Sequence, residues 1–362
     1  MKHAGAGAVS KWTRFLGLCL LSAVLMLSAC GDDDGGGGGD SQASTSGAKT
    51  TSVKLALGSR GLVFAPVVIA DAAGIFEKHG LDVELVVTGS GAVTFPALLN
   101  GDTPFGAIVF SDSLKAAAEG QLVTNVSTIM SQYATDVVVT KEFAEKNGIT
   151  GDMEWQDSIG RMKGATIAIA TVGSGSDLLL RFLLKEAGLD PDKDVTITPI
   201  SSDTGRLAAF RAGRIDSVLT ASPVPETLVD SVGAVYVARP TSGGVEPLDG
   251  FVYTTLAVNK QYGEKNPDVV SRMVAAMAET MKLIHDDPAK VNEALSNAEG
   301  FSELSPEVLD QAIKNNLPAI PASPVIPDDA IAHNAKLLGI ESPPTADQVI
   351  DNSYAEKVAG GE

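Results

Sequence analysis

The sequence predicts an α/β protein of two similar lobes, and three observations lead to this prediction. A pattern of residues repeats with an offset of 112 residues, first from Val53 and again from Ala165. Each copy has the order strand, helix, strand, helix, strand, which is typical of a parallel α/β lobe with right-handed crossovers. The chain after residue 52 is also long enough, at roughly 310 residues, for two domains with cores of their own.

The strands of the two copies correspond one to one. Each is a short apolar run, as expected for strands that are covered on both faces of a parallel sheet. In chain order they lie at 53–58, 83–85 and 105–110 in the first copy, and at 165–170, 195–197 and 217–220 in the second. The sequence therefore predicts two Rossmann-like lobes.

One helix of each copy is also clearly marked. Residues 65–79 carry apolar side chains at close to helical spacing, and Gly80 follows as a C-cap. Residues 178–187 are the counterpart in the second copy, closed by Gly188. Both helices are expected to cross over between neighbouring parallel strands.

Two further strands connect the lobes. Residues 136–140 are expected to lead from the first lobe into the second and residues 251–258 to lead back, so that the pair forms a two-strand hinge. From residue 266 onward the chain is mostly helical, and we expect this region to pack on the first lobe. The predicted division is 53–134 plus 250–362 for lobe 1, and 135–249 for lobe 2.

The first residues predict export. Basic residues precede an apolar run at 15–29, which at fifteen residues is shorter than the roughly 20 that a membrane-spanning helix needs. The run ends in small residues before Cys30, a pattern similar to the bacterial lipobox, in which the leader is removed and the cysteine is lipidated. Residues 1–29 are therefore expected to be a lipoprotein signal peptide. An ordinary secretory signal and an uncleaved anchor are the alternatives.

The cysteine count agrees with a lipid anchor. Of the two cysteines, Cys19 lies inside the leader, so that cleavage leaves Cys30 with no partner for a disulfide. Residues 30–52 are rich in Gly, Asp and Ser and are expected to form a flexible tether. The sequence thus predicts a protein held on the extracytoplasmic face of a bacterial membrane.

Charge and composition exclude other classes of function. The formal net charge is −18, which disfavours binding to nucleic acid. His79, His285 and His333 are scattered, and none of them belongs to a pattern typical of a metal site or a catalytic group. We expect no enzymatic activity, no cofactor and no metal, and a monomer.

The loops after the strands are rich in Gly and Ser and are where a ligand is expected, because open α/β sheets bind ligands beyond the carboxyl ends of their strands. Helix N-termini there offer free N–H groups that suit a sulfonate, nitrate or carboxylate. Arg60 is the candidate counter-ion, and three aromatic residues are candidates for an apolar wall. Simple helix capping, a solvated arginine and core packing are the alternatives. The predicted ligand-binding residues are Ser59, Arg60, Phe64, Ser90, Gly91, Phe110, Ser111, Tyr133, Thr171, Ser174 and Ser222.

Four segments resemble a known family, the nitrate, sulfonate and taurine substrate-binding proteins, which include binders of thiamine precursors. The segments are 70–83, 97–101, 213–216 and 266–270. The resemblance implies a type II periplasmic-binding-protein fold and an ABC permease with its ATPase as partners. It also implies ligand contacts from the strand-end loops. The chain departs from the family pattern at Pro104, where the second lobe keeps an acid at Asp216.

The family resemblance therefore implies a solute-binding lipoprotein of an ABC importer that captures a small, anionic ligand. A binder of a thiamine pyrimidine precursor, an enzyme on the same scaffold and a sensor lipoprotein that presents a ligand are the alternatives.

Overall fold

A computed structural model describes residues 50–248 and 250–361. The predicted signal peptide, Cys30 and the tether up to residue 49 lie outside these residues. Within the described part of the chain, no helix is long and apolar enough to cross a membrane.

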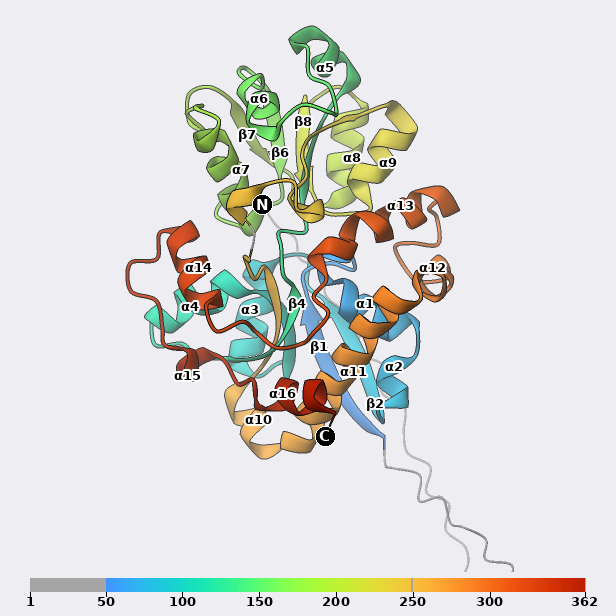
Figure 1. Ribbon diagram of the computed structural model, residues 1–362, viewed down its shortest axis with the longest axis vertical. Coiled ribbons are helices and arrows are strands. Elements are labelled where there is room, and N and C mark those ends of the chain that lie inside the picture. Colours follow the sequence, from blue (N-terminus) through green and yellow to red (C-terminus); the bar gives the residue numbers. More distant parts are fainter. Residues whose placement is uncertain (1–49, 249, 362) are drawn as a thin grey trace, which may run out of the picture. The chain divides into compact units, whose positions relative to one another are not determined.

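The first sheet has five strands in the order β2-β1-β3-β10-β4 (Figure 1). β1 is parallel to β2 and β3, and Val53 of β1 is in register with Val83 of β2. β10 is antiparallel to both β3 and β4. The bounds are β1 Thr51–Leu57, β2 Leu81–Val87, β3 Phe105–Val109, β4 Thr124–Met130 and β10 Thr254–Val258.

The second sheet repeats this topology, with the order β7-β6-β8-β5-β9. β6 is parallel to β7 and β8, with Ile167 in register with Ile197, while β5 is antiparallel to β8 and β9. The bounds are β5 Asp136–Val139, β6 Thr166–Ile169, β7 Thr196–Pro199, β8 Ser217–Thr220 and β9 Val235–Ala238. The repeated unit predicted from the sequence, and with it the two-lobed α/β fold, is confirmed.

The two strands expected to connect the lobes are each integrated into one sheet. β5 follows the first sheet in the chain but belongs to the second, and β10 follows the second sheet but belongs to the first. The backbone crosses between the sheets in residues 131–135 and again between β9 and β10. Both strands are hydrogen-bonded to a neighbouring strand on each side and are therefore fixed within their sheets. Any bending between the lobes would have to occur in the crossings.

The helices of the two lobes cover the sheets in corresponding places (Figure 1). In the first lobe they are α1 Ala65–Ala72, α2 Ile75–Lys78, α3 Gly91–Asn100 and α4 Phe110–Ala118. In the second they are α5 Lys141–Asn147, α6 Trp155–Gly160, α7 Gly175–Glu186, α8 Asp203–Arg211 and α9 Val224–Val232. Short 3-10 turns occupy Leu62–Phe64, Pro240–Ser242, Glu246–Leu248 and Leu317–Ala319.

The prediction of a single helix at 65–79 is wrong in one respect, because the chain forms two helices there. α1 ends at Ala72, and Gly74 has a φ of 67°, in the left-handed region, before α2 begins at Ile75. An apolar stripe can continue across such a break, which is why the side-chain pattern alone did not reveal it. The predicted counterpart at 178–187 is one helix, α7, which begins three residues earlier at Gly175.

The C-terminal region is helical and packs mainly on the first lobe. α11 buries its apolar stripe against α1, α2 and β4, and α16 packs on α11. α13 differs, because it contacts α9 of the second lobe, as Figure 1 also shows. The bounds are α10 Lys260–Lys265, α11 Pro267–Asp286, α12 Pro288–Ser296, α13 Pro306–Asn316, α14 Ala330–Leu338, α15 Ala346–Val349 and α16 Ser353–Gly360.

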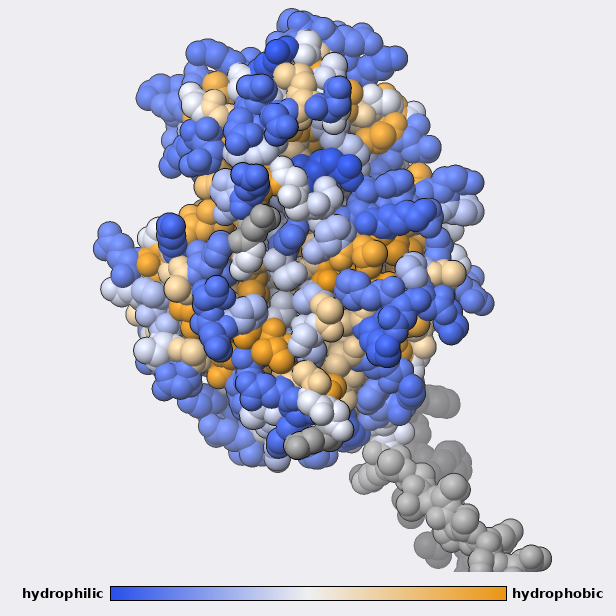
Figure 2. Space-filling view, viewed as in Figure 1, coloured by the Kyte–Doolittle hydropathy of each residue, from blue (hydrophilic) through white to orange (hydrophobic). Residues whose placement is uncertain are grey.

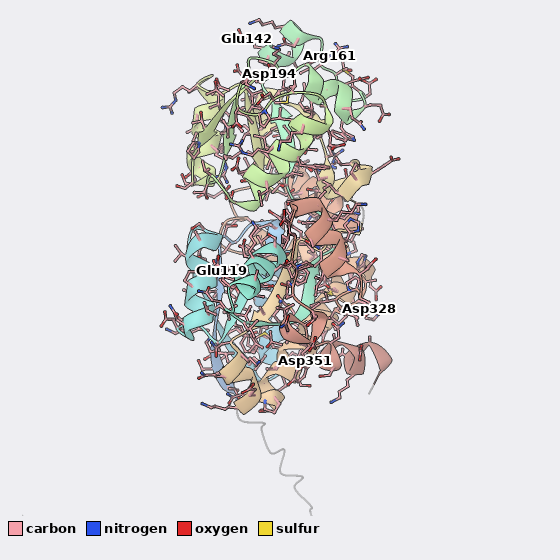
Figure 3. The ribbon with its side chains drawn as sticks, turned by 90° about the vertical axis from the view of Figure 1, so that its left-hand side faces the viewer. Glu119, Glu142, Arg161, Asp194, Asp328 and Asp351 are labelled. Atoms are coloured by element: carbon pink, nitrogen blue, oxygen red, sulfur yellow. The ribbon has the colours of Figure 1, made fainter. Side chains whose placement is uncertain are left out.

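The surface of the described residues is mainly polar. Hydrophilic residues cover most of the face in Figure 2, and acidic side chains such as Glu142, Asp194 and Asp351 lie on both lobes in Figure 3. Large exposed apolar side chains are few, among them Val93 and Val172. This surface agrees with the strongly negative net charge.

Candidate ligand-binding site

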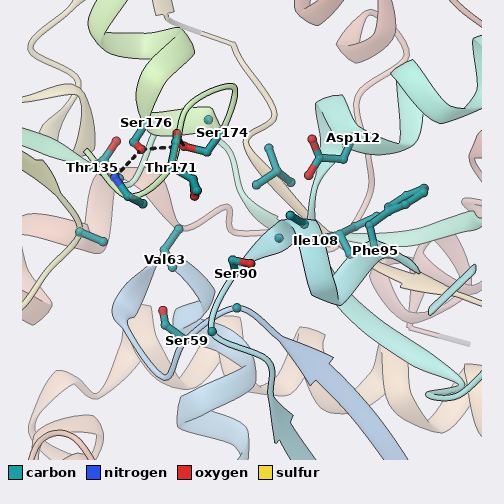
Figure 4. Close-up of a pocket in the computed structure, with 18 of the residues that line it drawn as sticks. Ser59, Val63, Ser90, Phe95, Ile108, Asp112, Thr135, Thr171, Ser174 and Ser176 are labelled. Atoms are coloured by element: carbon teal, nitrogen blue, oxygen red, sulfur yellow. Dashed lines mark hydrogen bonds between the residues drawn. The ribbon is translucent and has the colours of Figure 1, made fainter. Parts of the chain in front are cut away.

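The strand-end loops of both lobes surround one cavity of about 520 Å³. The loops after β1, β2 and β3 line it from the first lobe, and the loops after β6, β7 and β8 line it from the second (Figure 4). Parallel strands all end at the same edge of their sheet, so this edge is where separate loops come together. The volume lies within the range of roughly 300 to 1,000 Å³ that is typical of sites for small organic molecules.

Seven of the eleven predicted binding residues line this cavity. They come from four different loops, those after β1, β2, β6 and β8, which the repeat marks as equivalent points of the two lobes. The seven are Ser59, Phe64, Ser90, Gly91, Thr171, Ser174 and Ser222. Their individual contacts with a ligand stay a prediction.

Arg60, the predicted counter-ion, is not among the lining residues. Its Nη1 lies 2.9 Å from Asp71 Oδ2 of α1, and its Nε lies 3.3 Å from Glu299 Oε2, in the loop between α12 and α13. The guanidinium is therefore neutralised by acids of the same lobe. Its position gives no support to a direct contact with the ligand.

Phe110, Ser111 and Tyr133 also lie behind the cavity wall rather than in it. Phe110 and Ser111 are buried at the start of α4, Phe110 in an apolar cluster with Val252. Tyr133 is buried with its ring stacked 4.5 Å from that of Phe251 and 4.4 Å from that of Tyr253. Since Tyr253 does line the cavity, Tyr133 supports the wall from behind.

The sequence analysis missed several residues of the wall. Apolar side chains there include Val63, Phe95, Ile108 and Tyr253. Charged residues of the wall and rim are Asp112, Lys115, Glu119, Asp203 and Arg206. Asp112 directly follows Ser111 and so lay within reach of the loop argument. Val63 lies in the loop after β1 that was already singled out. The other residues come from strand β3, from α3, α8 and α4 with its C-cap, or from the second crossing, which the choice of strand-end loops did not cover.

Asp112 is the most unusual charged group in the cavity. Burial raises the pKa of its carboxyl, and the nearby ammonium of Lys115 opposes that shift in part. Asp112 has neither a hydrogen bond nor an ion pair with any other described residue. Tyr253 is also buried, and burial raises the pKa of its phenol, which therefore stays neutral at physiological pH.

Arg206 on α8 is a second buried charge, and it is paired. Its Nη2 forms an ion pair with Asp203, one turn earlier, and Nη1 donates to the carbonyl oxygens of Ile200 at 2.6 Å and Ser201 at 3.2 Å. The guanidinium thus ties the loop after β7 to α8. Most of its donor groups are used within the protein.

The loop after β6 forms a small hydrogen-bond network of its own, drawn in part as dashed lines in Figure 4. Ser174 Oγ donates to the carbonyl oxygen of Thr171 at 2.7 Å and lies 2.9 Å from Ser176 Oγ. Ser176 Oγ in turn accepts from the backbone N–H of Ala170 at 3.3 Å. The loop is held in shape before any ligand arrives.

The described residues contain no group of three or more His, Cys, Asp or Glu side chains arranged to hold a metal ion. Besides apolar side chains and hydroxyl groups, the described residues of the wall and rim offer three charged groups that form no ion pair with another described residue: the carboxyls of Asp112 and Glu119 and the ammonium of Lys115. Such an arrangement can bind a small molecule through hydrogen bonds and apolar contacts.

Comparisons with known proteins give this site its context. YtlA of Bacillus subtilis, named as a binding protein, is 22% identical over 312 residues, which cover 84% of each chain. The solved alkanesulfonate-binding protein SsuA of Xanthomonas axonopodis pv. citri, bound to MOPS, superposes with a TM-score of 0.62. It is 19% identical, with 80% of this chain and 91% of that chain covered. The periplasmic nitrate-binding protein NrtA of Synechocystis PCC 6803 has a TM-score of 0.65 at 15% identity, with coverages of 86% and 89%.

These structural likenesses show that the chain has the fold of the periplasmic binding proteins. The model of the NMT1-like family matches residues 46–297, which include both parallel repeat units and all of α11. On this match, the chain belongs to the NMT1-like family.

Proposed function

We propose that the protein is the solute-binding component of an ABC importer and captures a small molecule in the cavity between its two lobes. The observation that carries this proposal is the cavity of about 520 Å³, lined by equivalent loops of both repeat units. A site divided between two lobes can enclose a ligand when the lobes move together. Relatives named as binding proteins for alkanesulfonate and nitrate support the same role.

The proposed lobes are 53–134 plus 250–362 and 135–249, with the two crossings between the sheets as the hinge. Residues 131–135 and the segment between β9 and β10 belong to neither sheet, which supports their role as the bending points. Closing about these segments would bring the loops after β1 and β2 toward the loop after β6.

We further propose that the mature protein begins at a lipidated Cys30 and is held at the extracytoplasmic face of the membrane as a monomer, where it delivers its ligand to a permease and its ATPase. The basic leader, the apolar run and the small residues before Cys30 support this position. We propose a transport role without catalysis. Relatives named for binding, together with the absence of a nucleophile-and-base pattern in the sequence, support that role.

A thermal-shift and calorimetric screen of the purified protein tests the proposed function. The panel contains nitrate, alkane- and arylsulfonates, small carboxylates and small amines. A ligand present at 100 times its Kd adds about 2.7 kcal/mol to the free energy of unfolding and raises Tm by a few degrees. We expect one chemical class to bind.

Two variants connect binding to the cavity. Ser90→Phe places a ring in the cavity at a position whose side chain makes no capping hydrogen bond, and it should abolish binding while α3 stays intact. Arg60→Ala is the control, because Arg60 does not line the cavity and its loss should leave the affinity unchanged. The proposal is contradicted if no compound of the panel binds, or if the Ser90→Phe variant binds a ligand as tightly as wild type does.

A further inference from the structure

Four of the helices that begin at or near the cavity have an acid in their first turn, whereas the 3-10 turn Leu62–Phe64 and the helix α1 that follows it have none. The acids are Asp112 of α4, Asp177 of α7, Asp203 of α8 and Glu226 of α9. A helix N-terminus attracts an anion through its partial positive charge and free N–H groups. Each of these four helices thus carries a negative charge of its own in its first turn, and Asp177 also accepts from the backbone N–H of Gly173 at 2.8 Å. The field they present to a bound anion is correspondingly weak.

The helix α3 also begins at the cavity without an acid of its own, but it faces one from another element. Asp112 Oδ2 lies 3.5 Å from the point that a Cβ atom on Gly91, the first residue of α3, would occupy. The N-terminus of α3 is thus also beside a negative charge. An oxyanion placed there would sit within reach of the Asp112 carboxylate.

Three serine hydroxyl groups of the second-lobe wall, those of Ser174, Ser176 and Ser222, have their hydrogens committed within the protein. Ser222 Oγ donates to Glu226 Oε1 at 2.9 Å, and Ser174 Oγ donates to the carbonyl oxygen of Thr171. Since Ser174 has only one hydrogen, Ser176 must be the donor in the contact between the two serines. These hydroxyl oxygens therefore have only lone pairs left to offer a ligand.

The Asp112 carboxyl is the remaining strong acceptor. In Figure 4 it projects from α4 into the space near Phe95 and Ile108, with its oxygens toward the cavity. Asp112 is half-buried, and a carboxylate partly withdrawn from water without a partner is stabilised by a donor or a cation. Among the described residues of the cavity, Arg206 is the buried basic group and is paired with Asp203, with its Nε left without a partner, while Lys115 is exposed at the rim. The ligand itself is left as the donor.

We infer that the ligand presents nitrogen-bound hydrogens to Asp112 and to the oxygens of Ser174 and Ser222, and is a neutral or cationic nitrogen-bearing organic molecule such as an amine or an amino-substituted ring. This inference rests on the proposed function and names the ligand class of that same site. It differs from the sulfonate, nitrate or carboxylate that the sequence predicts. Acceptor groups of such a molecule would face Ser59 and Ser90 of the first lobe.

The test measures binding of matched probe pairs to the purified protein by calorimetry. Each pair shares a carbon skeleton and differs in its polar group: butylamine and butanesulfonate, benzylamine and phenylmethanesulfonate, aminopyrimidine and pyrimidine carboxylate. We expect at least one nitrogen-bearing member to bind and its anionic partner not to bind. Asp112→Asn keeps the shape of the side chain and should weaken that binding about tenfold or more.

A matched control removes the same charge elsewhere: Asp157→Asn on the exposed face of α6 should leave the affinity unchanged. The direction in which Asp112→Asn changes the affinity also distinguishes the two ligand classes. An anion would bind more tightly once the carboxylate is gone, so anionic probes that bind, and bind better to Asp112→Asn, overturn this inference while the proposed function stands. If no member of either class binds, the proposed function fails first.

Discussion

At the scale of single residues, Asp136 at the start of β5 is a buried acid close to the first crossing. Burial and the neighbouring carboxylate of Glu226 raise the pKa of its carboxyl from 3.8 to about 7. The backbone N–H of Thr241 donates to Oδ1 at 3.1 Å, and with Arg239 it lowers this pKa in part. Tyr236 is the other titratable group facing this pair, and burial raises the pKa of its phenol, so it stays neutral.

The raised pKa of Asp136 predicts how stability depends on pH. The folded state holds a proton on Asp136 between about pH 4 and pH 7 that the unfolded state has lost, so the free energy of unfolding falls as pH rises through this window. Asp136→Asn is neutral throughout and keeps the acceptor for Thr241. We therefore expect the variant to melt at a higher temperature than wild type at pH 8, with a smaller difference at pH 5.

Thermal melts of both proteins at the two pH values check this prediction. Asp157→Asn, an exposed carboxyl on α6, is the control and should show no pH-dependent difference from wild type. A constant difference between Asp136→Asn and wild type at both pH values would contradict the prediction.

Arg60 shows at the same scale why a residue's place in a loop does not reveal its role. The loop argument correctly located the segment beside the cavity, since Ser59 and Gly61 on either side both line it. The direction of the Arg60 side chain depends on Asp71, in the helix that follows, and on Glu299, which is far away in the sequence. Only the packing of the region after α12 on the first lobe brings Glu299 to it.

At the scale of elements, the break between α1 and α2 depends on one glycine. Gly74 takes a φ of 67°, a region that costs a residue with a side chain about 1 kcal/mol or more. A Cβ there would meet no atom closer than 3.8 Å, so space is not the constraint. The backbone conformation alone demands glycine.

We expect Gly74→Ala to lower the free energy of unfolding by about 1 kcal/mol. Chemical denaturation with a constant m-value is the suitable measurement. Gly360→Ala serves as the opposite control, because Gly360 lies in α16 with ordinary helical backbone and open space, and should not lose stability. If both variants were equally stable, the left-handed conformation at Gly74 would not be the constraint.

α13 is the element whose position the helical pattern did not predict. Its Asn315 donates to Glu226 Oε1 at 2.8 Å, and the same oxygen accepts from Ser222 in the cavity wall. The C-terminal region thus contacts the second lobe as well as the first. A three-residue chain of hydrogen bonds joins it to the proposed site.

At the scale of the whole molecule, each sheet receives one strand from the chain that has just left the other sheet. Each has three parallel strands from its own repeat unit, and its fourth strand comes from chain that has crossed over from the other sheet. As a result, the backbone crosses between the lobes at two separate places. Two crossings restrict the relative motion more than one would, which suits a cleft that closes on a ligand.

The proposed lipid anchor is tested on the complete protein in cells. We expect wild type in the membrane fraction and Cys30→Ser in the soluble fraction, because the variant lacks the thiol to which lipid is attached. Cys19→Ser is the matched control and should remain with the membrane, since Cys19 is predicted to be removed with the leader. Cys30→Ser that stays with the membrane would indicate an uncleaved anchor instead.

Much of the fold was determined by the sequence by itself. The repeat starting at Val53 and Ala165, the parallel strands and the stripe of α11 are local or periodic signals, because burial on one face imposes a spacing on apolar residues. The same signals placed Ser59, Ser90, Thr171 and Ser174 in strand-end loops. Those loops do meet at one cavity.

Tertiary packing determines which side chains face the cavity and which of their charges are paired. Asp112 is left unpaired while Arg60 is neutralised, and the hydrogens of Ser174 and Ser222 are already used. Each of these outcomes depends on a side-chain direction or on a partner brought close by folding. Periodicity reports which face of an element is buried, but hydrogen bonds and ion pairs act over a few ångströms between elements that can be any distance apart in the chain.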